Sequence, residues 1–350
     1  MFLTTFIKSH FTKLSVPIFN SHSGSRIDKF LITDLNRSWN EVQKYIRNGE
    51  INVNNKKIKD HQFLLQEGDI VTYWDKLKKQ DQNQLRPLPN VQSYEDLKKM
   101  ILYENDQIII LNKKHGYASQ GGANPNYNIP EILNLYFKNF YIIHRLDQLT
   151  AGLLIIAKNK DVATEISRII QEKAFITKKY IAVVQGTIKS QKGLIDRPLL
   201  FNTNNQKQTC YNEEQLLEGK YLPARTSYEI IEEYEYGNEI YTVLDLQIFE
   251  GRKHQIRAHL SQVLKTPILF DQKYGFQFTK SNRELQTQLF GENQGIMLQA
   301  KKMIFQNFPV DINEQFYQNS NGSMIQKNGK LEIEATFSNE FESLLQLLPK

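Results

Sequence analysis

The chain has 350 residues, of which 40% are hydrophobic and 23% charged, a composition typical of a soluble globular protein. No apolar run approaches the length needed to cross a membrane, and the single cysteine, Cys210, excludes an intramolecular disulfide. The seven histidines lack zinc-ligand spacing and have no cysteine cluster to join, so we expect no metal.

The positive charge of the chain is concentrated near its N-terminus. The formal net charge is +6, and residues 1–79 hold 13 Lys and Arg against 8 Asp and Glu. The remaining residues hold 31 against 30. This asymmetry favours an RNA-binding module joined to a near-neutral body, with a solubilising surface as the alternative.

Residues 1–20 form a lead segment with Lys8, Lys13 and no acidic residue. A helical face is predicted for this segment, made of Leu3, Ile7, Phe11 and Leu14. A basic, acid-free amphipathic segment is also typical of a mitochondrial presequence. We expect a cytoplasmic protein, with a mitochondrial one as the alternative.

Residues 21–75 are predicted to form two helices followed by a hairpin. The spacing of Ile27, Phe30 and Leu31 predicts the first helix, and the second ends at Gly49. This order resembles the S4-like RNA-binding domain, a small αα-hairpin domain. Five basic residues are candidates for contacting the phosphate backbone, although they could simply form a solvated face: Lys44, Arg47, Lys56, Lys57 and Lys59.

Residues 76–100 are polar and are predicted to be a linker, partly helical after Ser93. The body, residues 101–350, begins with a buried strand at 108–111 and the sequence Asn-Lys-Lys-His-Gly at 112–116. Residues 276–295 are predicted to be an inserted polar loop. Residues 331–337 alternate like a final strand, and a short C-terminal helix is expected after them.

The body is organised around His-Arg-Leu-Asp-Gln-Leu-Thr-Ala-Gly at 144–152, which lies between two apolar runs of strand length. On spacing alone, Asp147 could simply brace a turn. The motif resembles the sequence signature of the RluA family of RNA pseudouridine synthases, in which its aspartate is catalytic.

Two further motifs agree with this family. Residues 178–186 resemble its second motif, which carries an active-site tyrosine, and residues 251–257 resemble its Gly-Arg-Thr-His-Gln-Ile-Arg motif. The chain departs from the family at Lys114, Lys253 and Gln299, where proline, threonine and histidine are usual. The resemblance implies an α+β fold with a mixed, mostly antiparallel sheet around a central cleft.

The resemblance also implies roles for individual residues. Asp147 would start the reaction as an ionised carboxylate, Arg257 would pair with it, and Tyr180 would pack against the base and is a candidate for proton transfer at C5. Four residues are expected to contact the substrate: His144, Arg145, Thr150 and Leu298. Because uridine isomerisation oxidises nothing and adds no group, no cofactor is expected.

The expected partner is RNA, and the expected oligomeric state is a monomer. The Gln-Gly-Gly sequence at 120–122 is similar to the RluC branch, which favours large-subunit ribosomal RNA as the substrate. Transfer RNA is the alternative substrate of the same chemistry, since target choice depends on shape and loop contacts. A catalytically silent RNA-binding or ribosome-assembly protein is the alternative of a different class.

Overall fold

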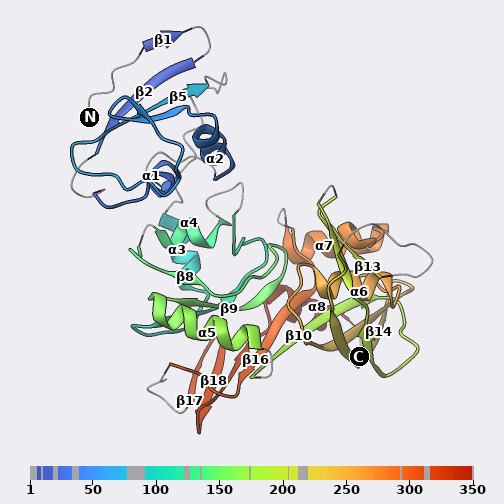
Figure 1. Cartoon of the computed structure of the whole chain (residues 1–350). Helices are drawn as coiled ribbons and strands as arrows, with labels where there is room; N and C mark the ends of the chain where they lie inside the picture. Colours follow the sequence, from blue (N-terminus) through green and yellow to red (C-terminus); the bar gives the residue numbers. More distant parts are fainter. Residues whose placement is uncertain are drawn as a thin grey trace. The chain divides into compact units, whose positions relative to one another are not determined.

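A computed structural model describes most of the chain. The described residues are 6–8, 11–18, 23–33, 39–76, 91–121, 127–134, 136–172, 175–203, 205–211, 220–291, 294–310 and 316–348. The chain divides into two compact units, Met1–Arg86 and Pro87–Lys350 (Figure 1). Among the helices described, none is long and apolar enough to span a membrane.

The first unit combines two helices with a small antiparallel sheet. Its elements are β1 (Phe6–Lys8), β2 (Phe11–Pro17), α1 (Ile27–Thr33), α2 (Trp39–Arg47), β3 (Ile51–Val53), β4 (Lys56–Lys57) and β5 (Ile70–Lys76). The strands lie in the order β1-β2-β5-β3-β4. Both helices bury aliphatic residues spaced three or four apart, such as Ile27 and Leu31 on α1 and Val42 and Ile46 on α2, in one core. This arrangement confirms the predicted helix pair and hairpin.

The helix predicted within residues 1–20 is wrong, because the described part of this segment forms strands. β2 pairs antiparallel with β5 over its whole length, from Phe11 opposite Lys76 to Pro17 opposite Ile70. Threonine, phenylalanine and valine in this run favour extended backbone, and the edge of β5 supplies the hydrogen-bond partners that a helix would have supplied internally.

The second unit is built on a large sheet. Its first half contains α3 (Val91–Lys98), β6 (Ile101–Glu104), β7 (Ile108–Lys113), α4 (Ile129–Asn134), β8 (Tyr141–Ile142), β9 (Ala151–Ala157) and α5 (Lys160–Glu172). Helix α3 falls within the expected linker, and it buries Leu97 in the same core as Ile109 of β7. The residues from 91 onward are therefore part of this unit's packing.

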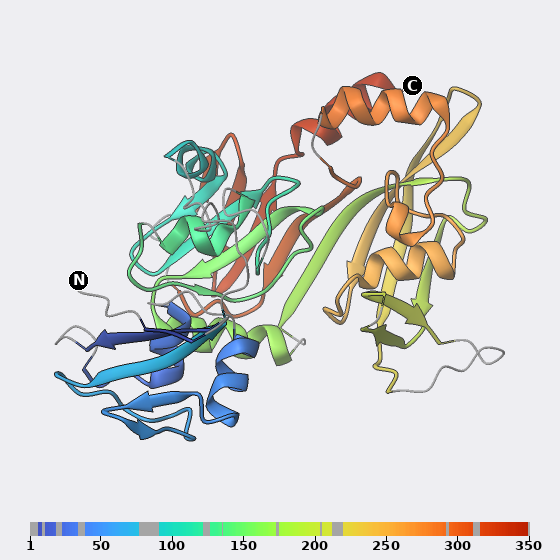
Figure 2. The same ribbon diagram turned by 90° about the horizontal axis from the view of Figure 1, so that it is seen from above.

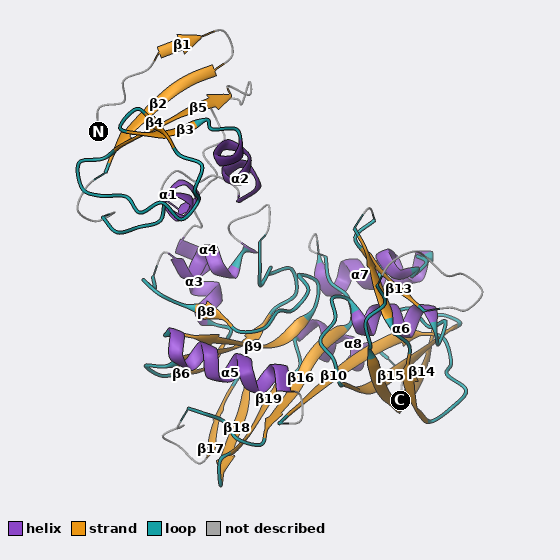
Figure 3. Cartoon of the chain, in the orientation of Figure 1, coloured by secondary structure: helices purple, strands orange, loops and turns teal. Residues whose placement is uncertain are grey.

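The second half begins with the long strand β10 and ends at the C-terminal helix. Its elements are β10 (Ile176–Gln185), β11 (Lys192–Asp196), β12 (Leu199–Asn202), β13 (Lys207–Cys210), β14 (Arg225–Tyr236), β15 (Glu239–Ile248), α6 (Gln255–Gln262), the 3₁₀ helix η3 (Gln272–Tyr274), α7 (Lys280–Phe290), β16 (Leu298–Phe305), β17 (Phe316–Asn319), β18 (Gly322–Lys327), β19 (Lys330–Ala335) and α8 (Asn339–Leu347). Figure 3 shows helices and strands in separate colours.

Twelve of the described strands of this unit form one sheet that branches at β16, and β12 and β13 form a separate two-stranded sheet. The main path of the large sheet is β11-β14-β15-β10-β16-β19-β18-β17. β16 also pairs in parallel with β9, where Gln299 lies opposite Ala151 and Ala300 opposite Gly152. All the other strand pairs of the sheet are antiparallel. The fold is therefore α+β with a mixed, mostly antiparallel sheet, as predicted, and β10 and β16 join its two halves (Figure 2).

Residues 276–295 contain helix α7, so the predicted inserted loop is wrong here. The side chain of Thr279 accepts a hydrogen bond from the backbone of Asn282, and the Asn282 side chain accepts one from the backbone of Thr279. This reciprocal cap fixes the first turn of the helix. The helix buries Leu285 and Phe290. A polar composition concealed it because only these widely spaced side chains are needed to attach it to the core.

Replacing Gly152 with alanine is expected to destabilise the second unit. Gly152 has φ +108°, and a Cβ there would lie 2.1 Å from the carbonyl oxygen of Ala300 and 2.6 Å from its nitrogen. Backbone atoms of a paired strand cannot move aside cheaply, so we expect a loss of about 3 kcal/mol or more. Thermal unfolding should show a midpoint lower by roughly 6 to 12 °C.

Gly116→Ala is the matched control for this substitution. Gly116 also has a positive φ, +84°, but no atom of the described residues lies within 4 Å of a Cβ at that position. Its replacement should cost only about 1 kcal/mol, through backbone strain alone. Equal losses in the two variants would show that the strand contact at Gly152 is not tight.

Candidate active site

The loop that carries Asp147 connects β8 to β9, and a second segment holds its backbone from behind. The Ser119 hydroxyl donates to the Leu146 carbonyl at 2.7 Å and accepts from the Leu146 N–H at 3.1 Å. The Gly116 N–H donates to the Gln148 carbonyl at 2.9 Å. The Lys113 ammonium donates to the same carbonyl at 3.3 Å. The residues on both sides of Asp147 are therefore fixed, which limits where its side chain can point.

Lys113 is fully buried at the end of β7. Besides Gln148, its ammonium donates to the carbonyl oxygens of Lys114, at 3.1 Å, and Tyr117, at 2.9 Å. Burial lowers the pKa of this lysine to about 7, while the charge of Asp147 acts in the opposite direction. Three carbonyl acceptors satisfy the ammonium, so Lys113 connects the 113–117 turn to the Asp147 loop.

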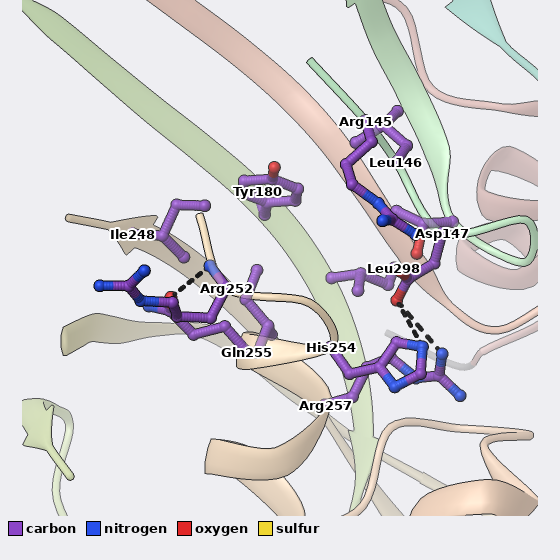
Figure 4. Close-up of a pocket in the computed structure, with 12 residues that line it drawn as sticks. Arg145, Leu146, Asp147, Tyr180, Ile248, Arg252, His254, Gln255, Arg257 and Leu298 are labelled. Carbon is purple, nitrogen blue, oxygen red and sulfur yellow. Dashed lines mark hydrogen bonds and ion pairs between the residues drawn. The ribbon is translucent and has the colours of Figure 1, made fainter. Parts of the chain in front are cut away.

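Asp147 lies in a solvent-open pocket of about 380 Å³ (Figure 4). The pocket is lined by Arg145, Leu146, Asp147, Thr150, Tyr180, Ile248, Arg252, His254, Gln255, Ile256, Arg257 and Leu298. The Asp147 side chain is 16% exposed, and its Oδ2 accepts a hydrogen bond from Nη1 of Arg257 at 3.2 Å. A carboxylate is thus presented to a partly apolar cavity with an arginine fixing its direction.

A second carboxylate, Asp271, holds Arg257 in place. Arg257 donates from Nε to Oδ2 of Asp271 at 2.7 Å and from Nη2 to Oδ1 at 2.8 Å. Both side chains are almost completely buried. Burial alone would lower the pKa of Arg257, but the hydrogen bonds and charges of Asp271 and then Asp147 outweigh it and raise that pKa. The guanidinium remains charged, with its planar fork fixed by Asp271 and one N–H directed at Asp147.

His254 and Tyr274 complete the surroundings of the carboxylate. Nε2 of His254 lies 3.6 Å from Oδ2 of Asp147, and its Nδ1 lies 3.0 Å from the Tyr274 hydroxyl. Burial lowers the pKa of His254 to about 4, so the imidazole is uncharged at neutral pH. Arg257 is therefore the cation paired with Asp147, and His254 fills the space beside it.

Tyr180 lies on β10 and faces the same pocket. Its ring is buried, and burial followed by the charge of Asp147 raises the pKa of the phenol above its usual range. A phenol that holds its proton this strongly is a poor base at neutral pH. The side chain therefore contributes a neutral aromatic surface next to the carboxylate.

The structure brings most of the predicted site residues together. Asp147, Tyr180 and Arg257 share the pocket, and three of the four expected substrate contacts also line it: Arg145, Thr150 and Leu298. The lining does not include His144. Its Nε2 accepts a hydrogen bond from the Ile155 N–H at 3.1 Å, which ties the loop to β9. His144 thus has a structural partner where a substrate contact was expected.

Sequence reasoning missed Asp271 and Lys113 as parts of this site. Asp271 lies 14 residues after Arg257 and outside any motif, so its only sequence signal was an acidic residue next to an apolar run. Lys113 lies in the quoted Asn-Lys-Lys-His-Gly sequence, but its burial depends on β7, β9 and the loop packing together. Neither contact follows from local spacing.

Gln299 has an explanation in the structure. It is fully buried on β16, where its Nε2 donates to the Thr336 carbonyl at 2.6 Å and its Oε1 accepts from the Ser338 N–H at 3.0 Å. The amide thus connects β16 to the segment before α8. It supplies both a donor and an acceptor there and does not line the Asp147 pocket.

The five basic residues predicted to bind phosphate are all exposed on the first unit. Lys44 and Arg47 lie in the last turn of α2, Lys56 and Lys57 form β4, and Lys59 follows. A Cβ at Gly49, just after α2, would lie 3.6 Å from Cδ of Lys57. The Lys57 stem therefore passes the end of α2, which brings the hairpin lysines and the helix cations to one region of this unit.

The geometry defines a buried arginine that directs a carboxylate into a pocket containing a tyrosine, on a branched, mostly antiparallel sheet. Residues 107–262 match the family described as RNA pseudouridylate synthase, and residues 25–71 match the S4 domain. The solved structure of the human protein called RNA pseudouridylate synthase domain containing 4 is similar in fold, with a TM-score of 0.53 and 20% identity. The match covers 73% of this chain and 96% of that one.

Two named relatives are similar in sequence over most of the chain. It is 31% identical over 285 residues to ribosomal large subunit pseudouridine synthase C of Escherichia coli (strain K12), covering 80% of this chain and 84% of that protein. It is 32% identical over 274 residues to the protein of the same name from Buchnera aphidicola, covering 77% and 82%. The chain therefore belongs to the RluA family of RNA pseudouridine synthases and carries an S4 domain. It is an isomerase that acts on RNA.

The partly buried imidazole of His144 is expected to make stability depend on pH. Burial and then the charge of Lys178 lower the pKa of His144 to about 3, against about 6.5 in an unfolded chain. The folded state holds the neutral form, so this contribution is complete above pH 6.5 and is lost as the pH falls toward 3. Unfolding free energy should fall by up to about 1 kcal/mol per pH unit from this group.

His144→Gln tests this dependence. Glutamine can accept the Ile155 hydrogen bond but cannot take up a proton, so urea unfolding between pH 7.5 and 4.5 should show a shallower loss than in the wild type. The wild-type and variant curves should converge as the pH falls. Parallel curves would mean that His144 does not titrate differently in the folded and unfolded states.

Proposed function

We propose that this enzyme converts specific uridines of large-subunit ribosomal RNA to pseudouridine. The ribosomal substrate is supported by the relatives named ribosomal large subunit pseudouridine synthase C, which this chain matches over most of their length. The observation that carries the catalytic assignment is the arrangement of Asp147, Arg257 and Tyr180 around one pocket. Transfer RNA remains the alternative substrate.

The target uridine must leave its stack to reach Asp147. Arg145 is exposed at the pocket, a position suited to filling the space that the base vacates. Thr150 is almost fully buried, and its Oγ1 has no hydrogen-bond partner among the described residues. A buried hydroxyl at the pocket wall would gain a partner in the uracil, which supports Thr150 as a substrate contact. Leu298 supplies an apolar wall, and His144 acts indirectly by shaping the loop.

Isomerisation cuts the C1′–N1 bond, turns the base and joins C5 to C1′. Asp147 would begin this sequence as a carboxylate, and its ion pair with the guanidinium of Arg257 fixes the direction in which it points. Tyr180 packs against the uracil face. Its firmly held proton favours this packing role over abstraction of the C5 proton. No step requires a cofactor.

The domain assignment follows the two family matches. We infer an S4-like RNA-binding domain within residues 21–75 and a catalytic domain within 101–350, to which α3 adds residues from 91. The five basic residues of the first domain would bind the phosphate backbone, supplying affinity without sequence choice. We also infer a monomer.

We infer that the protein works in the cytoplasm. The relatives named above are bacterial proteins, which supports that compartment. Removal of residues 1–20 as a presequence would take away β2, the strand that pairs with β5. The pairing therefore argues against the mitochondrial alternative.

Asp147→Asn is expected to abolish pseudouridine formation while leaving folding and RNA binding largely intact. The amide cannot supply the negative charge, although it keeps the size of the side chain and can still accept from Arg257. Pseudouridine mapping of ribosomal and transfer RNA should be carried out in cells that lack the protein and carry either form. We expect ribosomal sites that depend on the wild type and are absent with the variant.

Each other outcome of this mapping has a distinct meaning. Dependent sites confined to transfer RNA would replace the ribosomal substrate while keeping the chemistry. The absence of any dependent site would favour a silent RNA-binding protein. Turnover by the variant within about tenfold of the wild type would remove Asp147 from the mechanism.

Replacing the five S4-domain cations with glutamine should weaken RNA binding and flatten its salt dependence. Each lost phosphate contact lowers the slope of log affinity against log salt by about 0.7 to 0.9. The slope should therefore fall by up to about 3.5 to 4.5 in filter binding. The control variant replaces five exposed lysines of the second unit: Lys138, Lys160, Lys189, Lys327 and Lys330. Equal slopes in the two variants would refute the phosphate-binding role.

A further inference from the structure

Three lysines from separate elements immediately precede Tyr274 and two residues that contact its hydroxyl, next to the candidate active site. The Tyr274 hydroxyl accepts a hydrogen bond from the Gln208 N–H at 2.7 Å and lies 3.0 Å from Nδ1 of His254. Lys207 precedes Gln208, Lys253 precedes His254, and Lys273 precedes Tyr274. The contacts of one hydroxyl group thus bring together β13, the loop before α6, and η3.

The position of Lys253 is fixed by further contacts. Its ammonium lies 4.3 Å from the centroid of the Phe201 ring and donates to Oε1 of Gln206 at 3.1 Å. Phe201 belongs to β12, and Gln206 immediately precedes Lys207. Lys253 therefore extends over the β12–β13 hairpin to the side where Lys207 begins β13. The family motif usually has threonine at this position, which could not reach the hairpin in this way.

The three lysines carry positive charge without an acidic partner among the described residues. In the described part of the chain, none of the three forms an ion pair within 4.0 Å. Burial, then the charges of Arg257, Lys253 and Lys207, lower the pKa of Lys273. The charge of Asp147 acts on Lys273 in the opposite direction. Both nearby carboxylates already pair with Arg257, Asp271 through Nε and Nη2 and Asp147 through Nη1.

The cluster of these three lysines lies one side chain away from the reacting group. His254, which contacts Tyr274 through Nδ1, places its other ring nitrogen 3.6 Å from Asp147. A nucleotide drawn into the pocket carries a phosphate on each side, and both must stay near the pocket mouth when the base enters. Unpaired ammonium groups that repel one another gain most from such an anion.

We propose that Lys207, Lys253 and Lys273 bind an RNA backbone phosphate adjacent to the flipped uridine. The cluster is a second phosphate site, separate from the basic surface of the S4 domain, and it acts on the nucleotide being modified. This proposal rests on the proposed function, since it requires an RNA nucleotide in the Asp147 pocket. The cluster would hold the RNA strand in place while Arg145 fills the space that the flipped base leaves in the helix.

The test compares two triple variants of the full-length chain. One carries Lys207→Gln, Lys253→Gln and Lys273→Gln. The control carries Lys160→Gln, Lys189→Gln and Lys327→Gln, which change the net charge equally at exposed positions. Both are made with Asp147→Asn, so that binding is measured without turnover. The probe is an unmodified transcript of the organism's large-subunit ribosomal RNA.

The cluster variant should bind this transcript about tenfold more weakly than the control at physiological salt. Its slope of log affinity against log salt should be shallower by about 1 to 2. Equal affinities and slopes would overturn the proposal, whatever the wild type does. Failure of the proposed function would appear separately, as a wild type that makes no pseudouridine.

Single-turnover kinetics, with Asp147 restored, separate phosphate binding from an effect on the reacting groups. At saturating enzyme, the cluster variant should react at a rate within about threefold of the wild type. The loss should appear only as a higher enzyme concentration needed for half of the maximal rate. A lower saturated rate with unchanged half-saturation would overturn the proposal, because the lysines would then act on the chemistry.

A short RNA around a mapped uridine can locate the contact. Replacing one flanking phosphate with an uncharged methylphosphonate should weaken binding to the Asp147→Asn protein, and to the control triple variant, by about tenfold. It should have little further effect on the cluster variant, since the same contact cannot be lost twice. Additive losses at both flanking phosphates would show that the lysines bind elsewhere.

Discussion

The active site depends on one buried guanidinium shared between two carboxylates. Asp271 takes two N–H groups of Arg257 and keeps it charged in a place where burial would oppose the charge. An N–H of Nη1 directs Asp147 into the pocket. With Asp147 as its only partner, the buried guanidinium would lack the two hydrogen bonds that fix its plane. The direction of Asp147 therefore depends on a second carboxylate, Asp271, that does not line the pocket.

The branched sheet is what makes this arrangement possible. Tyr180 comes from β10, Leu298 from the start of β16, and Asp147 from the loop entering β9. β16 pairs with both of the other strands, so it holds all three residues at one point of the sheet. Arg257 arrives on α6, which follows β15, the other neighbour of β10. The site is the place where the two half-sheets meet, and a substitution at Gly152 would act on both.

The sequence predicted the parts of this site that are encoded locally. Asp147, Tyr180 and Arg257 were predicted because their three motifs resemble those of the RluA family, whereas spacing alone left Asp147 open as a turn residue. The sequence could not identify Asp271 or Lys113, whose roles exist only once distant segments have packed. It also assigned His144 to the substrate, since a histidine in a motif does not reveal that its acceptor nitrogen faces a strand N–H.

The errors in secondary structure have related causes. Residues 11–17 follow helical spacing, but the edge of β5 offered a full set of backbone partners, and this tertiary pairing prevailed over the local pattern. Helix α7 was concealed by polar residues, although a reciprocal cap and two buried side chains are enough to hold it. In both cases the deciding contact lies outside the window that a periodicity argument uses.

The parallel pairing of β9 with β16 also sets the order in which a newly made chain can mature. Residues 151 and 299 must meet, so β9 lacks this neighbour until most of the polypeptide has left the ribosome. The first unit has its own core and can fold during synthesis well before that moment. A nascent chain would therefore acquire its affinity for RNA before its catalytic power. Because contacts between such distant segments are slow to form, this joint is expected to govern the rate at which the enzyme becomes active.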